Sequence, residues 1–288
     1  ILKKLKPDVC IIMGDRYEML ATAITCKNLN IKIVHLCGGS TTEGSHDNDY
    51  RYCISRLSDF HFVETKQHKK ALLNNDIKNN RILVSGAPAL ENLDNKKYKD
   101  KDILFNELNI PAANQKIIVF TYHPETTKKL NHNLNNLKIS LNLLKYLIKK
   151  NYFIIITYPN ADHGFNKIID LIKKFDNENL NCKSFKSLGS NNYYNLLKYT
   201  NIVIGNSSSG IIECASFKLA VINCGERQKG RYCSWNVLHS QFKLNSLIKN
   251  IEIAESKTFK KKLLKLKNPY SIKIGSKKIL QIVSKFYS

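Results

Sequence analysis

The sequence predicts an α/β protein built from two parallel-sheet units. Short, continuous apolar runs alternate with stretches of helical periodicity along most of the 288 residues. Such strands, separated by helices, are typical of a parallel sheet covered on both faces. The polar stretch 87–115, with the charged run KKYKDKD, interrupts the alternation. We therefore expect one unit over residues 1–95 and another over residues 96–288.

The expected elements of the first unit begin with ILKKLKPDV, which reads as the end of a helix running into a strand. We therefore expect a segment before residue 1 and an incomplete first sheet. The expected strands are residues 9–14, 31–37, 59–64 and 82–86. The expected helices are residues 17–29, residues 49–57 and a Lys- and Gln-rich stretch between the last two strands.

The second unit resumes the alternation after residue 115. Its expected strands are residues 116–123, 152–159, 201–205 and 219–224. Its expected helices are residues 141–149, DLIKKF, residues 192–200 and IIECASF. The last forty residues are helical and basic in pattern, and we assign them to this unit.

The formal net charge of +23 raises the question of a nucleic-acid partner. The lysines are scattered along the chain, and basic residues do not cluster with aromatic ones, which argues against nucleic acid as the main partner. A basic surface would still attract an anionic substrate to a cleft.

The eight cysteines include no C-x-x-C pair and no Cys/His cluster with zinc spacing. We expect reduced thiols in a cytoplasmic protein, no metal and no cofactor. No apolar run approaches the roughly 20 residues that a membrane span needs.

Polar residues follow the expected strands at their carboxyl ends, where ligands bind in open α/β sheets. These clusters are Asp15-Arg16, the loop GGSTTEGSHDNDYR, HPETT from His123, YPNAD with Asn160, NSSSG and GERQKGR. We expect arginines, serines and a histidine from these loops to hold a pyrophosphate between two lobes.

The stretch NIVIGNSSSGIIE suggests an anion site at a helix start. Backbone N–H groups there favour an anion, and Ser207 and Ser208 would add hydroxyl donors. Gly210 would let a ligand approach closely, and Glu213 would accept hydrogen bonds from sugar hydroxyls. An ordinary serine-capped helix is the alternative. Arg227 and Arg231 on the next loop favour the phosphate interpretation.

Other clusters leave alternatives open. His123 could donate to a phosphate, transfer a proton or be a surface histidine. Asp15-Arg16 could be a simple ion pair. The segment DNDYR could be a helix start with Asp47 or Asn48 as N-cap, or carboxylates beside Arg51 suited to acid–base chemistry.

Six motifs, in order, resemble the hydrolysing UDP-N-acetylglucosamine 2-epimerases, including those of sialic-acid pathways. They are GDRYEMLA, HLCGG-x-T-x-E-G, YHPETT, YPNAD-x-G, IGNSSSGIIE and GERQKGR. The resemblance runs from about residue 7 to about residue 235. It implies two Rossmann-like domains facing a cleft, as in B-type glycosyltransferases, and a homo-oligomer acting on a nucleotide-sugar.

The resemblance also implies roles for single residues. Asp15 and Asp47 would lie near the sugar as catalytic carboxylates. His123 and Arg16 would contact the diphosphate or the sugar, and His123 is also a candidate catalytic residue. Asn160 would lie near the nucleotide, Ser207 and Ser208 would hold phosphate oxygens, Glu213 would hold the ribose hydroxyls, and Arg227 would bind phosphate. Arg51 and Gly210 are further candidate substrate-binding residues. The implied reaction is elimination of UDP across C1 and C2, followed by water addition with inversion at C2.

This chain departs from the family pattern in the loop after residue 37. Ser40 stands where the family usually has Glu, Asn48 where it has a second acid, and Tyr52 where a His is frequent. Glu43 and Asp49 are our candidates to replace the lost carboxylates. A B-type glycosyltransferase and, with less support, a nucleic-acid-binding protein are the alternative functions.

Overall fold

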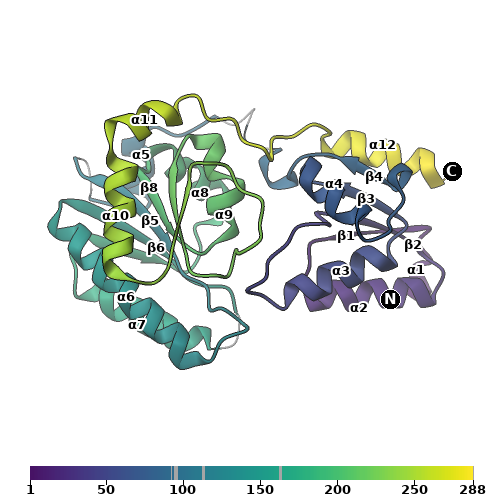
Figure 1. Ribbon diagram of the computed structural model, residues 1–288, viewed down its shortest axis with the longest axis horizontal. Helices are drawn as coiled ribbons and strands as arrows, with labels where there is room; N and C mark the ends of the chain where they lie inside the picture. Colours follow the sequence, from purple (N-terminus) through teal and green to yellow (C-terminus); the bar gives the residue numbers. More distant parts are fainter. Residues whose placement is uncertain (92, 94–96, 112–113, 162–163, 288) are drawn as a thin grey trace. The chain divides into compact units, whose positions relative to one another are not determined.

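The computed structural model describes residues 1–91, 93, 97–111, 114–161 and 164–287. The chain folds into two compact units, each with its own parallel sheet (Figure 1). The first unit comprises Ile1–Asp94, Gly230–Tyr232 and Pro269–Ser288. The second comprises Asn95–Lys229 and Cys233–Asn268. The predicted fold class, two parallel-sheet α/β units, is confirmed.

The first unit has a four-stranded parallel sheet in the order β1-β2-β3-β4. Its strands are β1 (Val9–Met13), β2 (Lys32–Leu36), β3 (Phe60–Val63) and β4 (Ile82–Val84). Its helices are α1 (Leu2–Leu5), α2 (Tyr17–Asn28), α3 (Asp47–Leu57), α4 (Lys66–Leu73) and α12 (Ser276–Tyr287). Because each strand is followed by a crossover to a parallel neighbour, the carboxyl ends of the strands share one edge of the sheet.

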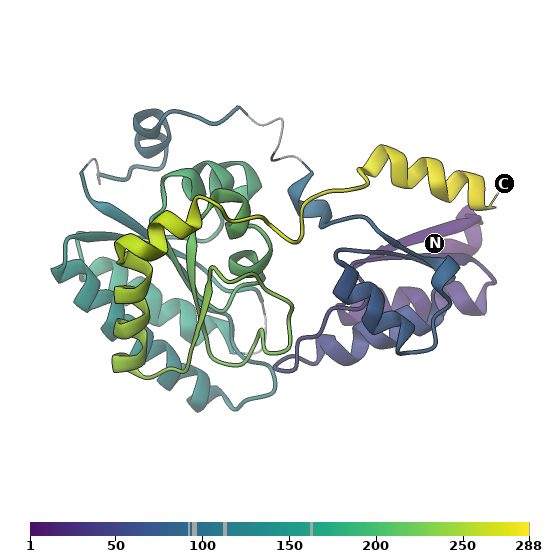
Figure 2. The ribbon, with the colours of Figure 1, turned by 45° about the horizontal axis from the view of Figure 1, so that its top comes forward.

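The C-terminal helix α12 belongs to the first unit, beside its sheet (Figures 1 and 2). Its Ile279 and Val283 join a core cluster with Val34 and Phe60. Our assignment of residues 269–288 to the second unit is therefore wrong. The apolar stripe of an amphipathic helix shows that the helix needs a partner, and does not show which sheet it covers.

The second unit has a six-stranded parallel sheet in the order β10-β9-β8-β5-β6-β7. Its strands are β5 (Lys116–Thr121), β6 (Tyr152–Thr157), β7 (Cys182–Phe185), β8 (Ile202–Gly205), β9 (Ala220–Cys224) and β10 (Val237–Ser240). Its helices are α5 (Lys101–Glu107), α6 (Leu130–Lys149), α7 (Phe165–Asn177), α8 (Gly189–Tyr199), α9 (Ser208–Ile212), α10 (Leu244–Glu255) and α11 (Lys257–Leu263). Counted from β5, this is the 3-2-1-4-5-6 order of dinucleotide-binding folds.

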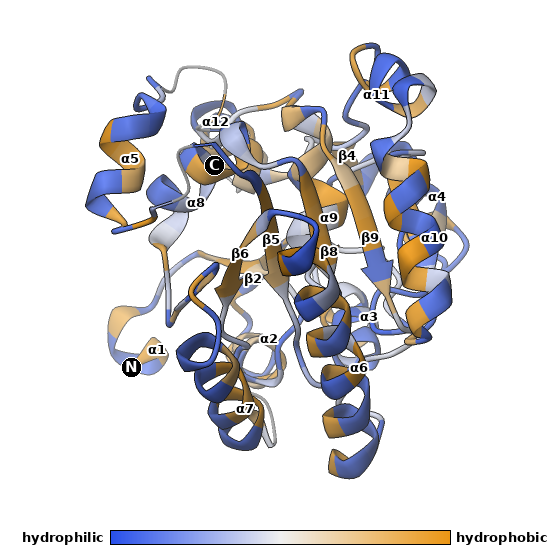
Figure 3. Cartoon of the chain, turned by 90° about the vertical axis from the view of Figure 1, so that its left-hand side faces the viewer, coloured by the Kyte–Doolittle hydropathy of each residue, from blue (hydrophilic) through white to orange (hydrophobic). Residues whose placement is uncertain are grey.

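The core of the second unit lies on both faces of this sheet. The central strands read as continuous apolar runs because helices cover both sides, and Figure 3 shows them as hydrophobic bands between two-faced helices. Leu137, Leu144 and Leu147 form the buried stripe of α6. The predicted helix over residues 141–149 is the second half of α6, and the structure extends the helix back to Leu130.

Two kinds of element differ from the prediction. Helix α5 lies inside the stretch 87–115 that we read as a connection, and β7 and β10 are strands without a predicted counterpart. Both strands are at sheet edges and only four residues long. Short edge strands carry weak apolar signals, since one side of the strand is not paired.

The first sheet also buries two histidines with different hydrogen bonding. The ring of His35 contacts Ser55 Oγ at 3.0 Å and the Gly14 carbonyl at 2.9 Å. His61 is fully buried, and neither of its ring nitrogens has a hydrogen-bond partner among the described residues. Burial, followed by the charges of His35 and Arg81, lowers the pKa of His61 to about 3. His61 is therefore neutral in the folded protein.

Replacing His61 with leucine should stabilise the first unit and reduce its sensitivity to acid. The substitution removes two ring nitrogens that lack hydrogen-bond partners. Each buried polar group without a partner costs about 1–3 kcal/mol of folding free energy. Since an unfolded histidine has a pKa of about 6.5, the unfolded wild type binds more protons below that pH. The depressed pKa of His61 therefore does not affect stability above about pH 6.5, and it makes the folded protein lose stability as pH falls from there toward 3. Urea unfolding at pH 7 and pH 4.5 measures both effects.

The exposed His46 of the same unit provides the control. A His46→Leu variant should keep the acid sensitivity of the wild type. If His61→Leu lost as much stability as the wild type between the two pH values, the buried neutral ring would not be a source of acid sensitivity.

Candidate functional site

The strand order of the second unit reverses between β5 and β8, where ligands bind in folds of this kind. Thr121 at the end of β5 is opposite Gly205 at the end of β8. Gly205 has φ +135°, and a Cβ there would lie 1.8 Å from the Thr121 carbonyl oxygen. Only glycine permits this approach. The residues that follow both strands therefore emerge side by side.

Asn206, directly after β8, organises this point and is fully buried. Its Oδ1 accepts a hydrogen bond from the His123 backbone N–H at 2.7 Å, and its Nδ2 donates to the His123 carbonyl at 2.8 Å. Its own carbonyl accepts from Arg227 Nη1 at 3.2 Å and from Gln228 Nε2 at 3.0 Å. One asparagine thus ties the loops after β5, β8 and β9 together.

His123 is a buried, neutral hydrogen-bond donor. Its Nδ1 accepts from the Asn160 backbone N–H at 3.1 Å, which places the ring proton on Nε2. Burial, and then the positive charge of Arg227, lowers the pKa of His123 to about 3. At neutral pH the ring can donate one hydrogen bond from Nε2 without carrying a charge.

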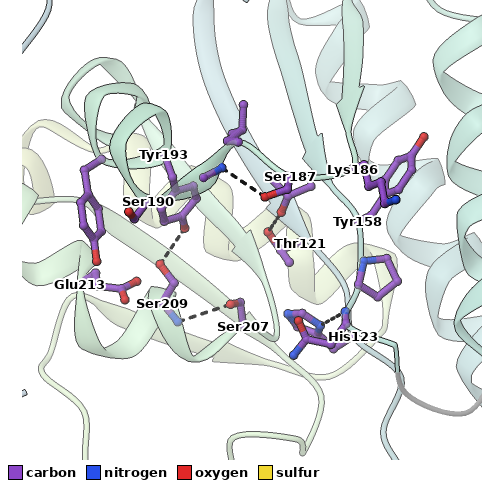
Figure 4. Close-up of a pocket in the computed structure, with 16 residues that line it drawn as sticks. Thr121, His123, Tyr158, Lys186, Ser187, Ser190, Tyr193, Ser207, Ser209 and Glu213 are labelled. Atoms are coloured by element: carbon purple, nitrogen blue, oxygen red, sulfur yellow. Dashed lines mark hydrogen bonds between the residues drawn. The ribbon is translucent and has the colours of Figure 1, made fainter. Parts of the chain in front are cut away.

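A pocket of about 400 Å³ opens beside this histidine (Figure 4). Tyr193 Oη lies 2.7 Å from Ser209 Oγ on its wall, and Glu213 lines it at the end of α9. Such a volume is within the range of small-ligand sites. The lining residues are Thr121, His123, Thr157, Tyr158, Pro159, Asn160, Lys186, Ser187, Leu188, Gly189, Ser190, Tyr193, Tyr194, Ser207, Ser209 and Glu213.

The predicted serines and Gly210 lie at the start of α9, and the glycine packs against the sheet. Ser207 is the N-cap of α9, and its Oγ accepts from the Ser209 N–H at 3.4 Å. Ser208 opens the helix and is half-buried. Gly210 is buried, and a Cβ there would lie 2.8 Å from Val221 Cγ1. The glycine therefore allows α9 to pack closely on β9, and its predicted contact with a ligand stays a prediction.

The second unit thus brings together His123, Ser207 and Arg227, as the motif order predicts. Sequence reasoning missed Asn206, Gln228 and Tyr193 as members of the site. An asparagine immediately after a strand-ending glycine is a usable signal, because its amide can pair with a neighbouring backbone as a peptide group does.

In the first unit, Arg51 of α3 is the largest fully buried side chain. Its Nη1 donates to the Ser40 carbonyl at 2.7 Å and to Thr42 Oγ1 at 3.1 Å. Its Nη2 forms an ion pair with Asp15, which follows β1. These contacts within its own unit indicate a positioning role for Arg51, and its predicted contact with substrate stays a prediction.

The structure also gives the burial and pairing of the other residues predicted in this unit. Arg16 is exposed and pairs with Glu18 at 3.2 Å, while Asp15 pairs with Arg51 instead. Glu43 is exposed, and Asp47 is half-buried.

The predicted start of α3 is also corrected. His46 is the N-cap, and Asn48 Oδ1 accepts from the Thr42 N–H at 2.9 Å. Asn48 lies in the first turn of α3, and its side chain holds the preceding loop at Thr42.

Glu64, at the end of β3, is the residue of the first unit that sequence reasoning missed most clearly. It is buried beside Cys37, with its Oε2 3.5 Å from His68 Nδ1. The sequence shows it only as the last letter of the strand DFHFVE, where nothing marks it as unusual.

Among residues 1–91, 93, 97–111, 114–161 and 164–287, no three His, Cys, Asp or Glu side chains are grouped as metal ligands. In the same part of the chain, no helix has the length and apolar character needed to cross a bilayer.

Three curated proteins are similar to this chain over most of its length. The GDP/UDP-N,N'-diacetylbacillosamine 2-epimerase (hydrolyzing) of Campylobacter jejuni is 38% identical, covering 89% of this chain and 65% of that protein. The UDP-N,N'-diacetylbacillosamine 2-epimerase (hydrolyzing) of Legionella pneumophila is 34% identical, covering 87% of this chain and 65% of that protein. Polysialic acid biosynthesis protein P7 of Escherichia coli is 32% identical, with 91% and 66% covered. The chain thus spans slightly less than two thirds of these relatives.

Solved structures show the same fold. The UDP-GlcNAc 2-epimerase of Neisseria meningitidis, bound to UDP-GlcNAc, matches with a TM-score of 0.81 at 20% identity, covering 99% of this chain and 78% of that one. The enzyme of Methanocaldococcus jannaschii, in complex with UDP-GlcNAc and UDP, matches with a TM-score of 0.79 at 21% identity, covering 99% and 77%. The model of the family described as UDP-N-acetylglucosamine 2-epimerase matches residues 1–284. This chain therefore belongs to the UDP-N-acetylglucosamine 2-epimerase family.

Proposed function

We propose that the protein is a hydrolysing 2-epimerase of nucleotide-sugars. It would convert UDP-N-acetylglucosamine, or a related UDP- or GDP-linked 2-acetamido sugar, into the free 2-epimer and the nucleoside diphosphate. Family membership supports the reaction, and the names of the Campylobacter and Legionella relatives support a 2-acetamido sugar.

The observation that carries the proposal is the pocket at the switch point of the second unit. It combines a neutral Nε2–H donor on His123 with the hydroxyls of Ser207 and Ser209, and Arg227 is anchored nearby. A diphosphate gains negative charge as the C1–oxygen bond breaks. Neutral and cationic hydrogen-bond donors together would stabilise that charge. Glu213 would accept hydrogen bonds from the ribose hydroxyls.

The residues of the first unit suit the sugar chemistry. A base must remove the proton from C2 while the C1–oxygen bond breaks and UDP leaves with the bonding electrons. Asp15, held by Arg51, would take that proton, and Asp47 would lie near the sugar. Water then adds to C1, and a proton returns to C2 from the other face.

Incubation with UDP-N-acetylglucosamine in deuterated water tests the reaction directly. The protein from its complete gene should release UDP and a 2-epimer that carries deuterium at C2. Absence of both, across a panel of UDP- and GDP-sugars, would contradict the proposal. Sugar transfer to an acceptor without exchange at C2 would instead indicate a glycosyltransferase.

Arg227→Ala should weaken UDP binding by about 1.5–3 kcal/mol, because it removes a charge-assisted hydrogen bond. Titration calorimetry with UDP measures the change. Lys167→Ala removes an exposed positive charge from α7 of the same unit and should leave the affinity unchanged. An unchanged affinity in Arg227→Ala would mean that this guanidinium does not contact the nucleotide.

A homo-oligomeric assembly and a cytoplasmic location complete the proposal. All eight cysteines are free, which supports a reducing compartment. Light scattering after size-exclusion chromatography would give the assembly state.

A further inference from the structure

Epimerisation at C2 requires two proton-transfer groups. The proton leaves one face of the carbon and another arrives on the opposite face, so a single fixed side chain cannot serve both. Asp15 provides one carboxylate. Ser40 in the loop after β2 and Asn48 in the first turn of α3 carry no carboxylate. Glu43 is exposed and Asp47 is half-buried, so a buried second proton carrier would have to come from elsewhere in the fold.

Glu64 lies at the edge where that carrier is needed. It directly follows β3, which pairs with β2 in the same parallel sheet, so it shares an edge with Asp15 after β1 and Cys37 after β2. Glu64 is 6% exposed, and the Cys37 thiol hydrogen-bonds to its carboxylate. Burial raises the pKa of Cys37, so the thiol keeps its proton and acts as the donor.

Glu64 also faces charged groups from several elements. Arg51 of α3, Arg231 and Asp15 act on it through their charges, and His68 Nδ1 is 3.5 Å from its Oε2. Burial raises the pKa of Glu64, and the two arginines oppose that effect in part. The pKa of His68 falls to about 3, mainly through burial, so this neighbour is neutral. The environment therefore favours a carboxyl group that can hold a proton.

Unpartnered polar atoms in this unit point to a ligand or water beside the cluster. Arg231 Nε, Ser40 Oγ and both ring nitrogens of His68 are buried without a hydrogen-bond partner among the described residues. Buried polar groups normally have one. Segment Gly230–Tyr232 is fixed in the first unit by Tyr270, whose hydroxyl donates to the Tyr232 carbonyl at 2.5 Å. Arg231 therefore belongs to the first unit and acts on Glu64 there through its charge.

We propose that Glu64 is the second proton-transfer residue of the reaction. The assignment rests on the proposed function. Asp15 accepts the C2 proton as the C1–oxygen bond breaks, which leaves a sugar unsaturated between C1 and C2. Water then adds its hydroxide to C1 while Glu64 gives its proton to C2 on the opposite face. Asp15 releases its proton to solvent, Glu64 takes one up, and one water is consumed.

Glu64→Gln in the complete protein tests this role. Elimination needs Asp15 and should continue, while reprotonation should fail. We expect the ratio of unsaturated sugar to 2-epimer to rise at least tenfold, and epimer formation to fall by about 10²–10⁴-fold. UDP affinity should stay within about twofold of the wild type, because the proposed nucleotide contacts are in the second unit. Glu64→Asp keeps the acid and should retain part of the epimer formation.

The control is Asp76→Asn, an exposed carboxylate of the same unit at φ +62°, where asparagine fits well. It should behave as the wild type. Equal slowing of both products in Glu64→Gln, with the wild-type ratio, would assign Glu64 a structural role and overturn the inference. Epimer formation at the wild-type rate would also overturn it. If the wild type itself formed no epimer from any tested nucleotide-sugar, the proposed function would fail instead.

Discussion

Replacing Arg51 with methionine should lower the free energy of unfolding of the first unit by about 3–5 kcal/mol, the usual cost of breaking a buried ion pair from one side. Methionine fills a similar volume but donates no hydrogen bond. The Ser40 carbonyl and Thr42 Oγ1 lose their donor, and Asp15 loses its cation. Chemical denaturation followed by circular dichroism measures the loss.

A matched control lies in the same helix. Arg56 is exposed and donates to the Asn75 carbonyl at 2.9 Å. Arg56→Met should cost less than about 1 kcal/mol, as is usual for exposed polar contacts. Similar losses in the two variants would show that burial of the Arg51 network contributes nothing special to stability. An assay of epimer formation should find no activity in Arg51→Met. Asp15 and the loop at Ser40 lose the arginine that holds both of them.

Replacing Asn206 with alanine should weaken UDP binding by about 3 kcal/mol, roughly a hundredfold. The backbone N–H and carbonyl of His123 lose both partners on Asn206. Each buried group left without a partner costs about 1–3 kcal/mol, so the loops after β5 and β8 should separate. Titration calorimetry with UDP, together with urea unfolding, measures affinity and stability in one preparation.

Asn201 allows the effect on the site to be separated from the effect on the sheet. It lies at the opposite end of β8, and its Oδ1 accepts from the Ile117 N–H at 2.8 Å. Asn201→Ala should lower stability without changing UDP affinity. If Asn206→Ala bound UDP as the wild type does, the pocket would not depend on the geometry of the switch point.

Much of the fold was predictable because its signals are local. Continuous apolar runs such as YFIIIT specify buried parallel strands, and the leucine stripe of α6 specifies a helix. The signals that failed are short edge strands and the partner of α12. A strand paired on one side needs few apolar residues, and a helical stripe does not encode which sheet it covers.

The candidate site divides in the same way. The sequence by itself determined that polar loops follow the strand ends, and it named His123, Ser207, Glu213 and Arg227, because strand ends can be read from periodicity. Only the tertiary structure decided that Arg51 is buried as an anchor, that Gly210 serves packing, and that Glu64 is enclosed with two arginines. Burial and hydrogen-bond pairing arise from residues distant in the chain, so no local pattern in the sequence specifies them.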